Sequence, residues 1–331
     1  MSKVAITGAS GHIGANLVRA LLDDGRQVRA VLHDNKGLLV DLDVEWVKGD
    51  VCDPDSLRRA FEGVDAVYHL AALISIAGDL GGRVPRVNVE GARNVASAAL
   101  ACGVKRLVHF SSVHAFDQRP LDEPLDETRR RAEAPHHNAY DRSKAAGEKA
   151  VREVIEQGLD CVIVHPTGVI GPFDGQPSRM GQVFLDLYHR RLPALVAGGF
   201  DWVDVRDVVA GAMAAEDKGR SGENYLLSGN YRTVTEIAEL AESITGRKKP
   251  RLTTPMWLAR VGAPFQHALD NLRGRTPLFT SESLEALRAN KVIRHAKARE
   301  ELGYTPRPIE DSVRDTYAWF ESAGRLGAGA A

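Results

Sequence analysis

The chain has 331 residues, of which 44% are hydrophobic and 26% are charged, and its formal net charge at pH 7 is −1. These values are ordinary for a globular protein and exclude long disorder, collagen and coiled coil. Because Lys and Arg are not in surplus, we expect no nucleic-acid partner. The 3 cysteines are far apart in the sequence and form neither a disulfide framework nor a cysteine metal motif, which favours a reducing compartment.

The hydropathy of the chain bears on its location. Met1 and Ser2 lead directly into an apolar segment at Val4, so we expect no signal peptide. No apolar run approaches the ~18 residues that a membrane span requires. We therefore predict a cytoplasmic protein without a membrane partner.

In the first half of the chain, short apolar runs alternate with amphipathic segments of helix length. This alternation is typical of βαβ units around a parallel sheet whose strands are covered on both faces. The predicted strands are 3–7, 27–33, 44–48, 66–70, 106–111 and 160–165. The predicted helices between them are 12–23, 55–61, 89–101 and 139–157. The fold class predicted from this order is α/β, a Rossmann-like doubly wound parallel sheet.

Beyond Pro166 the pattern loosens into segments rich in Gly, Pro and Arg. Helices are predicted here at 233–245, 255–267 and 310–322. We predict a dinucleotide-binding domain over 1–165, to which 200–228 returns. Residues 166–199 and 229–322 are expected to form a smaller, mostly helical substrate-binding lobe, and 323–331 to fray.

A glycine motif, G-x-x-G-x-x-G, lies between the first predicted strand and the first predicted helix. Gly8 permits a tight turn, Gly11 lets the backbone approach a pyrophosphate, and Gly14 allows close packing of helix on strand. The N-terminus of the helix offers free N–H groups and the positive end of its dipole to phosphates. The dinucleotide contacts predicted in this loop are Gly8, Ser10, Gly11, His12, Ile13 and Gly14.

The end of the second strand distinguishes NAD from NADP. An acid there binds the ribose 2′-hydroxyl, whereas a cation accepts a 2′-phosphate. Asp34 is the candidate acid, and His33 and Lys36 are the candidate cations. The cations favour NADP over NAD, although for His33 and Asp34 a solvated loop is an equally good interpretation.

The end of the third strand offers a contact for the adenine ring. The carboxylate of Asp50 is a candidate acceptor for the adenine amino group, and the backbone N–H of Val51 a donor to a ring nitrogen. Asp50 is equally well interpreted as a turn or cap residue, because Asp53 and Pro54 are typical of a helix start.

A pattern suited to proton transfer begins at Tyr140. Lys144 follows it at i+4, so the two side chains share one face of a helix. A neighbouring ammonium and an oxidised nicotinamide would favour the phenolate form of the tyrosine. Ser112 lies past the fifth strand, at the sheet edge where ligands bind, and is the candidate to hydrogen-bond the reacting oxygen. Ser111 is interpreted as a strand cap.

These motifs occur together with five others in a fixed order along the chain. The others are Gly49-Asp50-Val51, His69-Leu70-Ala71-Ala72, Asn88-Val89-Glu90-Gly91, the segment His165 to Pro172, and Val203-Asp204-Val205-Arg206-Asp207-Val208. In this combination the chain resembles the extended short-chain dehydrogenases/reductases, the NAD-dependent epimerase/dehydratase family, over nearly its whole length. It is most similar to dihydroflavonol reductase-like and 3β-hydroxysteroid dehydrogenase-like members.

The resemblance implies roles for individual residues. Ser112, Tyr140 and Lys144 would form the catalytic triad, with Lys144 also holding the nicotinamide ribose. Asn88 would support the loop beside the cofactor groove. The groove and the nicotinamide would be met by Leu70, Ala71, Ala72, Pro166, Thr167, Gly168 and Val169. The family's reductases carry arginine at the position of His33, and its NAD-using members carry aspartate one position earlier, so this chain departs from both patterns.

Other conspicuous residues are given ordinary roles. His136, His137 and His114 lie near Tyr140 and Ser112, but no acid-rich or cysteine ligand set accompanies them in the sequence, so no metal is predicted. Asp204 and Asp207 precede a helix, and N-capping is their predicted role.

A homodimer is predicted from small residues on two helices. Such faces let helices approach closely, and in the resembled family they pair between subunits. The alanines concerned are Ala92, Ala96, Ala99, Ala145, Ala146 and Ala150.

Three functions are considered. The first is an NAD(P)H-dependent reductase or dehydrogenase that interconverts a carbonyl and a secondary alcohol on a small, fairly apolar substrate. The apolar stretch at 255–265 is either a wall of its pocket or the core of the small lobe. The alternative is an epimerase or dehydratase of nucleotide sugars with tightly bound NAD, in which arginines clamp a diphosphate or, as scattered charges, are solvated. The candidates are Arg179, Arg190, Arg191, Arg251, Arg273 and Arg275. The third is a dinucleotide sensor without catalysis, against which the intact serine, tyrosine and lysine argue.

Overall fold

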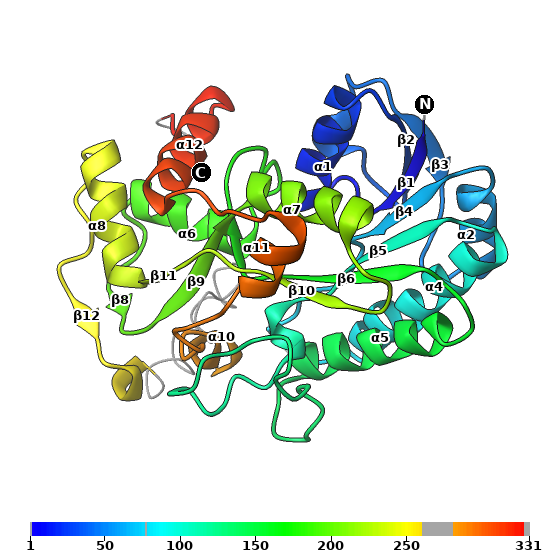
Figure 1. Ribbon diagram of the computed structural model, residues 1–331. Helices are drawn as coiled ribbons and strands as arrows, with labels where there is room; N and C mark the ends of the chain where they lie inside the picture. The colour runs from blue at the N-terminus through cyan, green and yellow to red at the C-terminus, as the bar shows by residue number, and fades with distance from the viewer. Residues whose placement is uncertain (1, 77, 260–280, 328–331) are drawn as a thin grey trace.

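A computed structural model of the chain describes residues 2–76, 78–259 and 281–327. Its centre is a sheet of seven parallel strands (Figure 1). Their order is β10-β6-β5-β4-β1-β2-β3. The strands are β1 (Lys3–Thr7), β2 (Gln27–Leu32), β3 (Glu45–Lys48), β4 (Ala66–His69), β5 (Arg106–Phe110), β6 (Cys161–Pro166) and β10 (Asn224–Leu227). The order reverses between β1 and β4, which is where ligands bind in open parallel sheets.

Helices cover both faces of this sheet, as the predicted fold class requires. Helices α1 (His12–Asp23), α7 (Val205–Lys218) and α11 (Ala296–Leu302) pack on one face. Helices α2 (Pro54–Phe61), α4 (Gly91–Ala101) and α5 (Ala139–Ile155) pack on the other. Short helical segments connect them: η1 (Gly37–Leu39), α3 (Arg83–Pro85), η2 (Arg86–Glu90) and η3 (Val113–Ala115).

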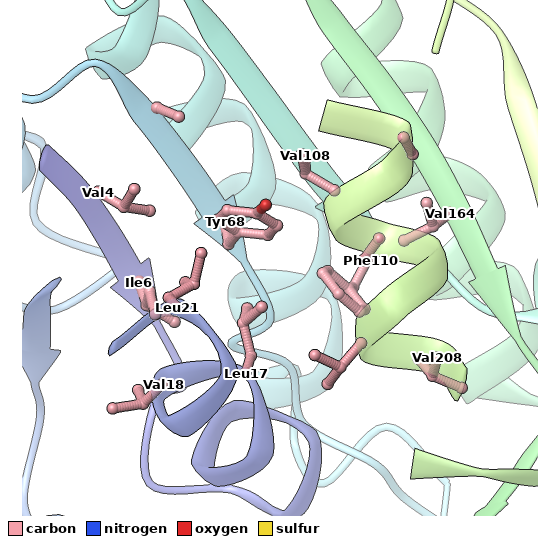
Figure 2. Close-up of a cluster of buried hydrophobic side chains, with 14 of the residues drawn as sticks. Val4, Ile6, Leu17, Val18, Leu21, Tyr68, Val108, Phe110, Val164 and Val208 are labelled. Carbon is pink, nitrogen blue, oxygen red and sulfur yellow. The ribbon is translucent and has the colours of Figure 1, made fainter. Parts of the chain in front are cut away.

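The core on the first face fixes α1 relative to the strand edge. Leu17, Val18 and Leu21 of α1 point onto Val4 and Ile6 of β1 (Figure 2). Their spacing of three and four residues is the helical period that predicted this helix. All five side chains are fully buried. At about 25 cal/mol per Å² of buried apolar surface, such packing contributes a large part of the stability that holds the loop before α1 in place.

The second half of the chain builds a smaller lobe beside the sheet (Figure 1). Its strands form two small sheets, β11-β9-β7 and β12-β8. These strands are β7 (Gly168–Ile170), β8 (Leu195–Val196), β9 (Gly199–Asp204), β11 (Asn230–Thr233) and β12 (Thr253–Thr254). The helices are α6 (Arg179–Tyr188), α8 (Val234–Thr245), α10 (Ser281–Ala286) and α12 (Ile309–Ser322). A separate apolar cluster, which includes Phe184, Trp202 and Tyr317, forms the lobe's own core.

The predicted fold class is confirmed, and most predicted elements lie within a few residues of the observed ones. The helix predicted at 89–101 differs, because the chain turns through η2 as a π-helix before α4 begins at Gly91. The strands of the small lobe and β10 were not predicted. They are short and pair with distant segments, so no local period announces them. Of the helix predicted at 255–267, residues 256–259 are helical and 260–267 lie outside the described residues.

Two predicted helix starts are confirmed. Asp53 caps α2 by accepting a hydrogen bond from the backbone N–H of Asp55 at 3.1 Å, with Pro54 in the first position. Asp204 caps α7 by accepting from the backbone N–H of Arg206 at 2.8 Å. Within the described ranges, no helix is both long and apolar enough to span a membrane.

Most of the alanines from which a homodimer was predicted are buried within the single chain. Ala92, Ala96 and Ala99 of α4 are buried within the single chain, as are Ala145 and Ala150 of α5. The three alanines of α4 belong to the apolar core on this face of the sheet, and α4 packs against α5. Burial of these alanines within one chain neither supports nor contradicts a subunit contact, so the homodimer stays a prediction.

Candidate active site

The loop between β1 and α1 has the geometry that the glycine motif predicts. Gly8 adopts a φ of +73°, and a Cβ there would lie 2.7 Å from the backbone nitrogen of Ala71. A Cβ at Gly14 would lie 2.3 Å from the carbonyl oxygen of Gly8, so this glycine permits the close packing of α1 on the loop. At Gly11 the nearest atom would be 3.4 Å away, which leaves this side of the backbone open.

The amino end of α1 is available to an anion. In the described chain no side chain caps this helix at Gly11, so its first N–H groups remain unpaired by a cap. Together with the helix dipole they favour a negatively charged group. The open cradle at Gly11 and these N–H groups fit the pyrophosphate of a dinucleotide.

The loop that follows β4 lies directly against the glycine loop. Leu70 donates its backbone N–H to the carbonyl of Thr7 at 3.1 Å, and Ala71 donates to the hydroxyl of Thr7 at 3.3 Å. Leu70, Ala71 and Ala72 therefore follow the strand next to β1, at the point where the strand order reverses.

Asn88 of η2 ties this loop to α5. Its side chain accepts from the N–H of Leu73 at 2.8 Å and donates to the carbonyl of the same residue at 3.0 Å. It also donates to the hydroxyl of Ser143 at 2.9 Å, and that hydroxyl donates to the carbonyl of Tyr140 at 2.7 Å. Asn88 thus connects the cofactor-side loop to the helix that carries the tyrosine.

The residues predicted to read the 2′ position gather at the ends of β2 and β3. His33 Nδ1 lies 2.5 Å from the Asp34 carboxylate, and His33 Nε2 lies 3.7 Å from Asp50. Lys36 places its ammonium 5.0 Å from the centre of the Trp46 ring. Asp50 also accepts from the backbone N–H of Cys52 at 2.8 Å, the turn role that was one of its two interpretations. Both cations and both carboxylates are therefore present at this edge.

The segment from Pro166 to Val169 continues from the end of β6 into β7. Thr167 donates its hydroxyl to Asp201 at 2.6 Å. Farther on, the carbonyl of Pro172 accepts from the Asn16 amide at 2.9 Å and lies 3.0 Å from His12 Nε2. The loop after β7 therefore lies against the start of α1, so segments from opposite halves of the chain meet beside the glycine loop.

Ser112, Tyr140 and Lys144 meet beyond the carboxyl end of β5. Ser112 caps the start of η3, and its hydroxyl accepts from the backbone N–H of His114 at 3.2 Å. Burial raises the pKa of Tyr140 to about 12, and a hydrogen bond with Ser112 acts in the opposite direction. The side chains of this chain alone therefore do not lower the phenol pKa as the sequence argument expected. At neutral pH the phenol is protonated and is a proton donor.

Lys144 is held one helical turn from Tyr140. It is buried, and its ammonium donates to the carbonyl of Phe110 at 2.9 Å, at the end of β5. Burial lowers the pKa of Lys144 to about 8, while the negative charge of Glu148 acts to raise it. Because this pKa is close to neutral pH, the fraction of Lys144 in the charged ammonium form changes with pH in that range.

Sequence reasoning missed Glu148, which lies one turn beyond Lys144. Its side chain is 1% exposed and accepts from Arg131 at 2.7 Å and from Arg152 at 3.0 Å. Burial would raise the pKa of Glu148, but His165 and Arg131 outweigh burial and hold it below the usual value. The repeat of four residues from Tyr140 through Lys144 to Glu148 is the signal that could have identified it.

Two histidines that the sequence analysis named without a catalytic role lie near Ser112. His165 of β6 is fully buried and donates from Nδ1 to the carbonyl of Ser112 at 3.0 Å. His114 packs against the Tyr140 ring with its Nδ1 2.9 Å from the Asp141 carboxylate. Burial would lower the pKa of His114, but Asp141 outweighs burial and raises it. The sequence does not show these contacts, because they join segments far apart in the chain.

The apolar stretch after β12 is divided between core and surface. Met256 and Ala259 pack on the cluster of Val196, Leu284 and Leu287. Trp257 on the same helical turn is 67% exposed. The remainder, 261–265, lies outside the described residues. In the described part of this stretch, the buried side chains therefore belong to the core of the small lobe, one of the two roles that the sequence analysis considered.

Comparison with known proteins decides the family. Residues 4–228 match the model of the NAD dependent epimerase/dehydratase family. The chain belongs to this family. This confirms the resemblance seen in the motifs, and the chain is an NAD(P)-dependent oxidoreductase of the extended short-chain dehydrogenase/reductase type.

Relatives of similar length support the assignment. The chain is 38% identical to sterol demethylase protein B of Methylococcus capsulatus, over 97% of this chain and 99% of that one. It is 33% identical to a candidate dihydroflavonol 4-reductase of Synechocystis, over 96% of this chain and 94% of that one. The solved structure of gox2253 is 32% identical and superposes with a TM-score of 0.86, covering 99% of this chain and 100% of that one.

Proposed function

We propose that this member of the family interconverts a carbonyl and a secondary alcohol on a small, fairly apolar substrate, with Tyr140 as the acid and base. The observation that carries the proposal is the meeting of Tyr140, Ser112 and Lys144 at the carboxyl end of β5, next to the open glycine loop. A nicotinamide bound there would accept or supply the hydride.

The chain's own residues supply the proton chemistry. In the direction of reduction, Tyr140 donates its phenolic proton to the carbonyl oxygen, and Ser112 hydrogen-bonds the same oxygen as charge develops on it. A phenol whose pKa is raised to about 12 is fully protonated at neutral pH, so it is ready for this step. In the direction of oxidation, the positive charges of Lys144 and of an oxidised nicotinamide would lower that pKa.

The groove residues hold the cofactor in this proposal. Gly8, Gly11 and Gly14, with the amino end of α1, would bind the pyrophosphate, and Lys144 the nicotinamide ribose. His33 and Lys36 support NADP, whereas the carboxylates of Asp34 and Asp50 beside His33 support the free hydroxyl of NAD. The preference for NADP therefore stays a prediction, and the ratio of the Kd values for NADPH and NADH measures it.

The substrate class rests on the relatives and on the division of the chain. One relative is named for sterols and another for a dihydroflavonol, and both names refer to fused ring systems. The small lobe, which we propose as the substrate-binding part, carries its own apolar core next to the sheet. We therefore propose a substrate with a mostly apolar ring system that carries one carbonyl or hydroxyl at the reacting carbon.

Replacing Tyr140 by Phe tests the assignment. The variant keeps the ring but removes the group that transfers the proton. We expect turnover to fall by about 10² to 10⁴-fold, the usual contribution of general acid–base catalysis. The Kd for the dinucleotide, measured by fluorescence titration, should stay within about twofold. Retained turnover would overturn the role of Tyr140.

The alternative from the sequence is a nucleotide-sugar epimerase or dehydratase that retains NAD. Of the arginines considered for a diphosphate, Arg191 lies 4.0 Å from Asp186, and Arg273 and Arg275 lie outside the described residues. Denaturing protein purified without added nucleotide and measuring the released dinucleotide separates the two functions. One equivalent of NAD per chain would favour the alternative, and empty protein would favour the reductase.

A further inference from the structure

A pair of histidines occupies a rigid turn just before α5. The turn runs from Ala134 to His137 and is closed by the backbone N–H of His137, which donates to the carbonyl of Ala134 at 3.0 Å. Pro135 occupies its second position, where its fixed φ suits such a turn. The rings of His136 and His137 lie with their centres 4.2 Å apart. The turn therefore presents two imidazoles side by side, close to the start of the helix that carries Tyr140.

A carboxylate from a different segment reaches the same place. Asp117 lies just after η3, the short helical segment that Ser112 caps. Its Oδ1 accepts from the backbone N–H of Arg119 at 3.0 Å, and its Oδ2 lies 3.8 Å from His137 Nε2. One ligand atom from each of Asp117, His136 and His137 lies within 4.8 Å of the other two. The fold thus brings to the histidine pair a carboxylate that lies 19 residues before His136 in the sequence.

We propose that Asp117, His136 and His137 bind a divalent metal ion of the zinc class, at a site outside the dinucleotide groove. Two imidazole nitrogens and one carboxylate oxygen are ligands that Zn²⁺ prefers, whereas Mg²⁺ and Ca²⁺ take oxygen ligands. Three protein ligands leave a fourth position of a tetrahedral site to water.

The geometry requires a small adjustment when the ion binds. With bonds of about 2.0 to 2.1 Å, tetrahedral ligand atoms lie roughly 3.4 Å apart. The pair Asp117 Oδ2 and His137 Nε2 is already close to this separation at 3.8 Å. His136 is exposed, so a rotation of its side chain can bring its nitrogen closer without disturbing packing. Asp117 and His137 are partly buried and held by backbone hydrogen bonds, so they form the fixed part of the site.

The proposed metal site lies close in the chain to two residues of the proposed active site, Ser112 and Tyr140. An ion there would join the segment that begins at Ser112 to the turn that precedes Tyr140. We expect it to stabilise the folded protein, because a ligand that binds only the folded state raises the free energy of unfolding. This expectation does not depend on the proposed reaction, since binding is measured without turnover.

The test is a titration of the metal-free protein with Zn²⁺ in competition with a chromogenic chelator. We expect the wild-type chain to bind one equivalent and its Tm to rise. Outer-shell partners alone change metal affinity by about 10- to 100-fold, so losing a direct ligand through H136A or H137A should weaken binding at least about tenfold. D117N should also weaken binding, because an amide oxygen is a poorer ligand for Zn²⁺ than a carboxylate.

H189A is the matched control, because His189 lies on α6's C-terminal side and contacts Arg325 instead. Its affinity for Zn²⁺ should equal that of the wild-type chain. H136A is the decisive variant, because its exposed side chain can be removed without unfolding the protein. The circular dichroism spectrum and the dinucleotide affinity of H136A should match those of the wild type. Failure of the wild type to bind Zn²⁺, or equal affinity in H136A, would overturn the proposal.

Discussion

Alanine at Gly11 should weaken dinucleotide binding without lowering the stability of the protein, whereas alanine at Gly14 should lower the stability. A Cβ at Gly11 meets nothing closer than 3.4 Å and the residue has a φ of −74°, which alanine adopts readily. Alanine reduces the conformational entropy of the unfolded chain, which stabilises the folded protein by about 0.4 to 1 kcal/mol. This gain roughly offsets the loss from replacing glycine by alanine at the helix N-cap. We therefore expect G11A to unfold at nearly the wild-type temperature.

The methyl group of alanine at Gly11 would occupy the space beside the backbone where we propose that the pyrophosphate binds, and would therefore weaken that binding. Losing one or two hydrogen bonds to a charged group costs about 1.5 to 3 kcal/mol each, so the Kd for the dinucleotide should rise at least about tenfold. At Gly14, in contrast, the Cβ would lie 2.3 Å from the carbonyl oxygen of Gly8 and 2.7 Å from that of Ala9. Such overpacking costs about 1 to 3 kcal/mol or more, and Tm should fall by several degrees at about 2 to 4 °C per kcal/mol.

Two measurements on each variant separate these effects. Differential scanning fluorimetry without nucleotide gives Tm, and fluorescence titration with NADH and NADPH gives Kd. The expected pattern is a stable G11A with weak binding and a destabilised G14A. A G11A variant that binds both dinucleotides like the wild type would refute the placement of the pyrophosphate at this loop.

Two further predictions concern buried carboxylates. Glu148→Gln removes the negative charge that raises the pKa of Lys144, so this pKa should fall below about 8, and the limb of the pH profile of kcat/KM that reports Lys144 should move to lower pH. An unchanged limb would contradict the coupling. Burial raises the pKa of Asp201 from 3.8 to about 6, so the folded state binds this proton more tightly than the unfolded state does. Stability from this group is full below pH 4 and is lost as the pH rises through 6. Asp201→Asn, which keeps the oxygen acceptor, should therefore gain up to about 3 kcal/mol over the wild type at pH 8 in urea unfolding, and little at pH 4.

The first half of the fold was determined by features that are local in the sequence. Strands covered on both faces are short and apolar throughout, and α1 has its apolar residues at the helical period, so both are visible in a single pass along the chain. The glycine loop and the spacing of Tyr140 and Lys144 are likewise local, because each lies within one turn or one loop. Together with the other motifs in their order along the chain, these patterns predicted the family.

Tertiary structure decided everything that joins distant segments. Glu148 lies next to Lys144 in the helix, yet its role depends on Arg131 and on His165 of β6, which only the fold brings to it. The alanines of α4 and α5 read as an outer face, but the packing of the two helices uses most of them inside one chain. Asp117 joins His136 and His137 in the same way. A side chain's partners are set by which strands and loops become neighbours, and no local period in the sequence records that.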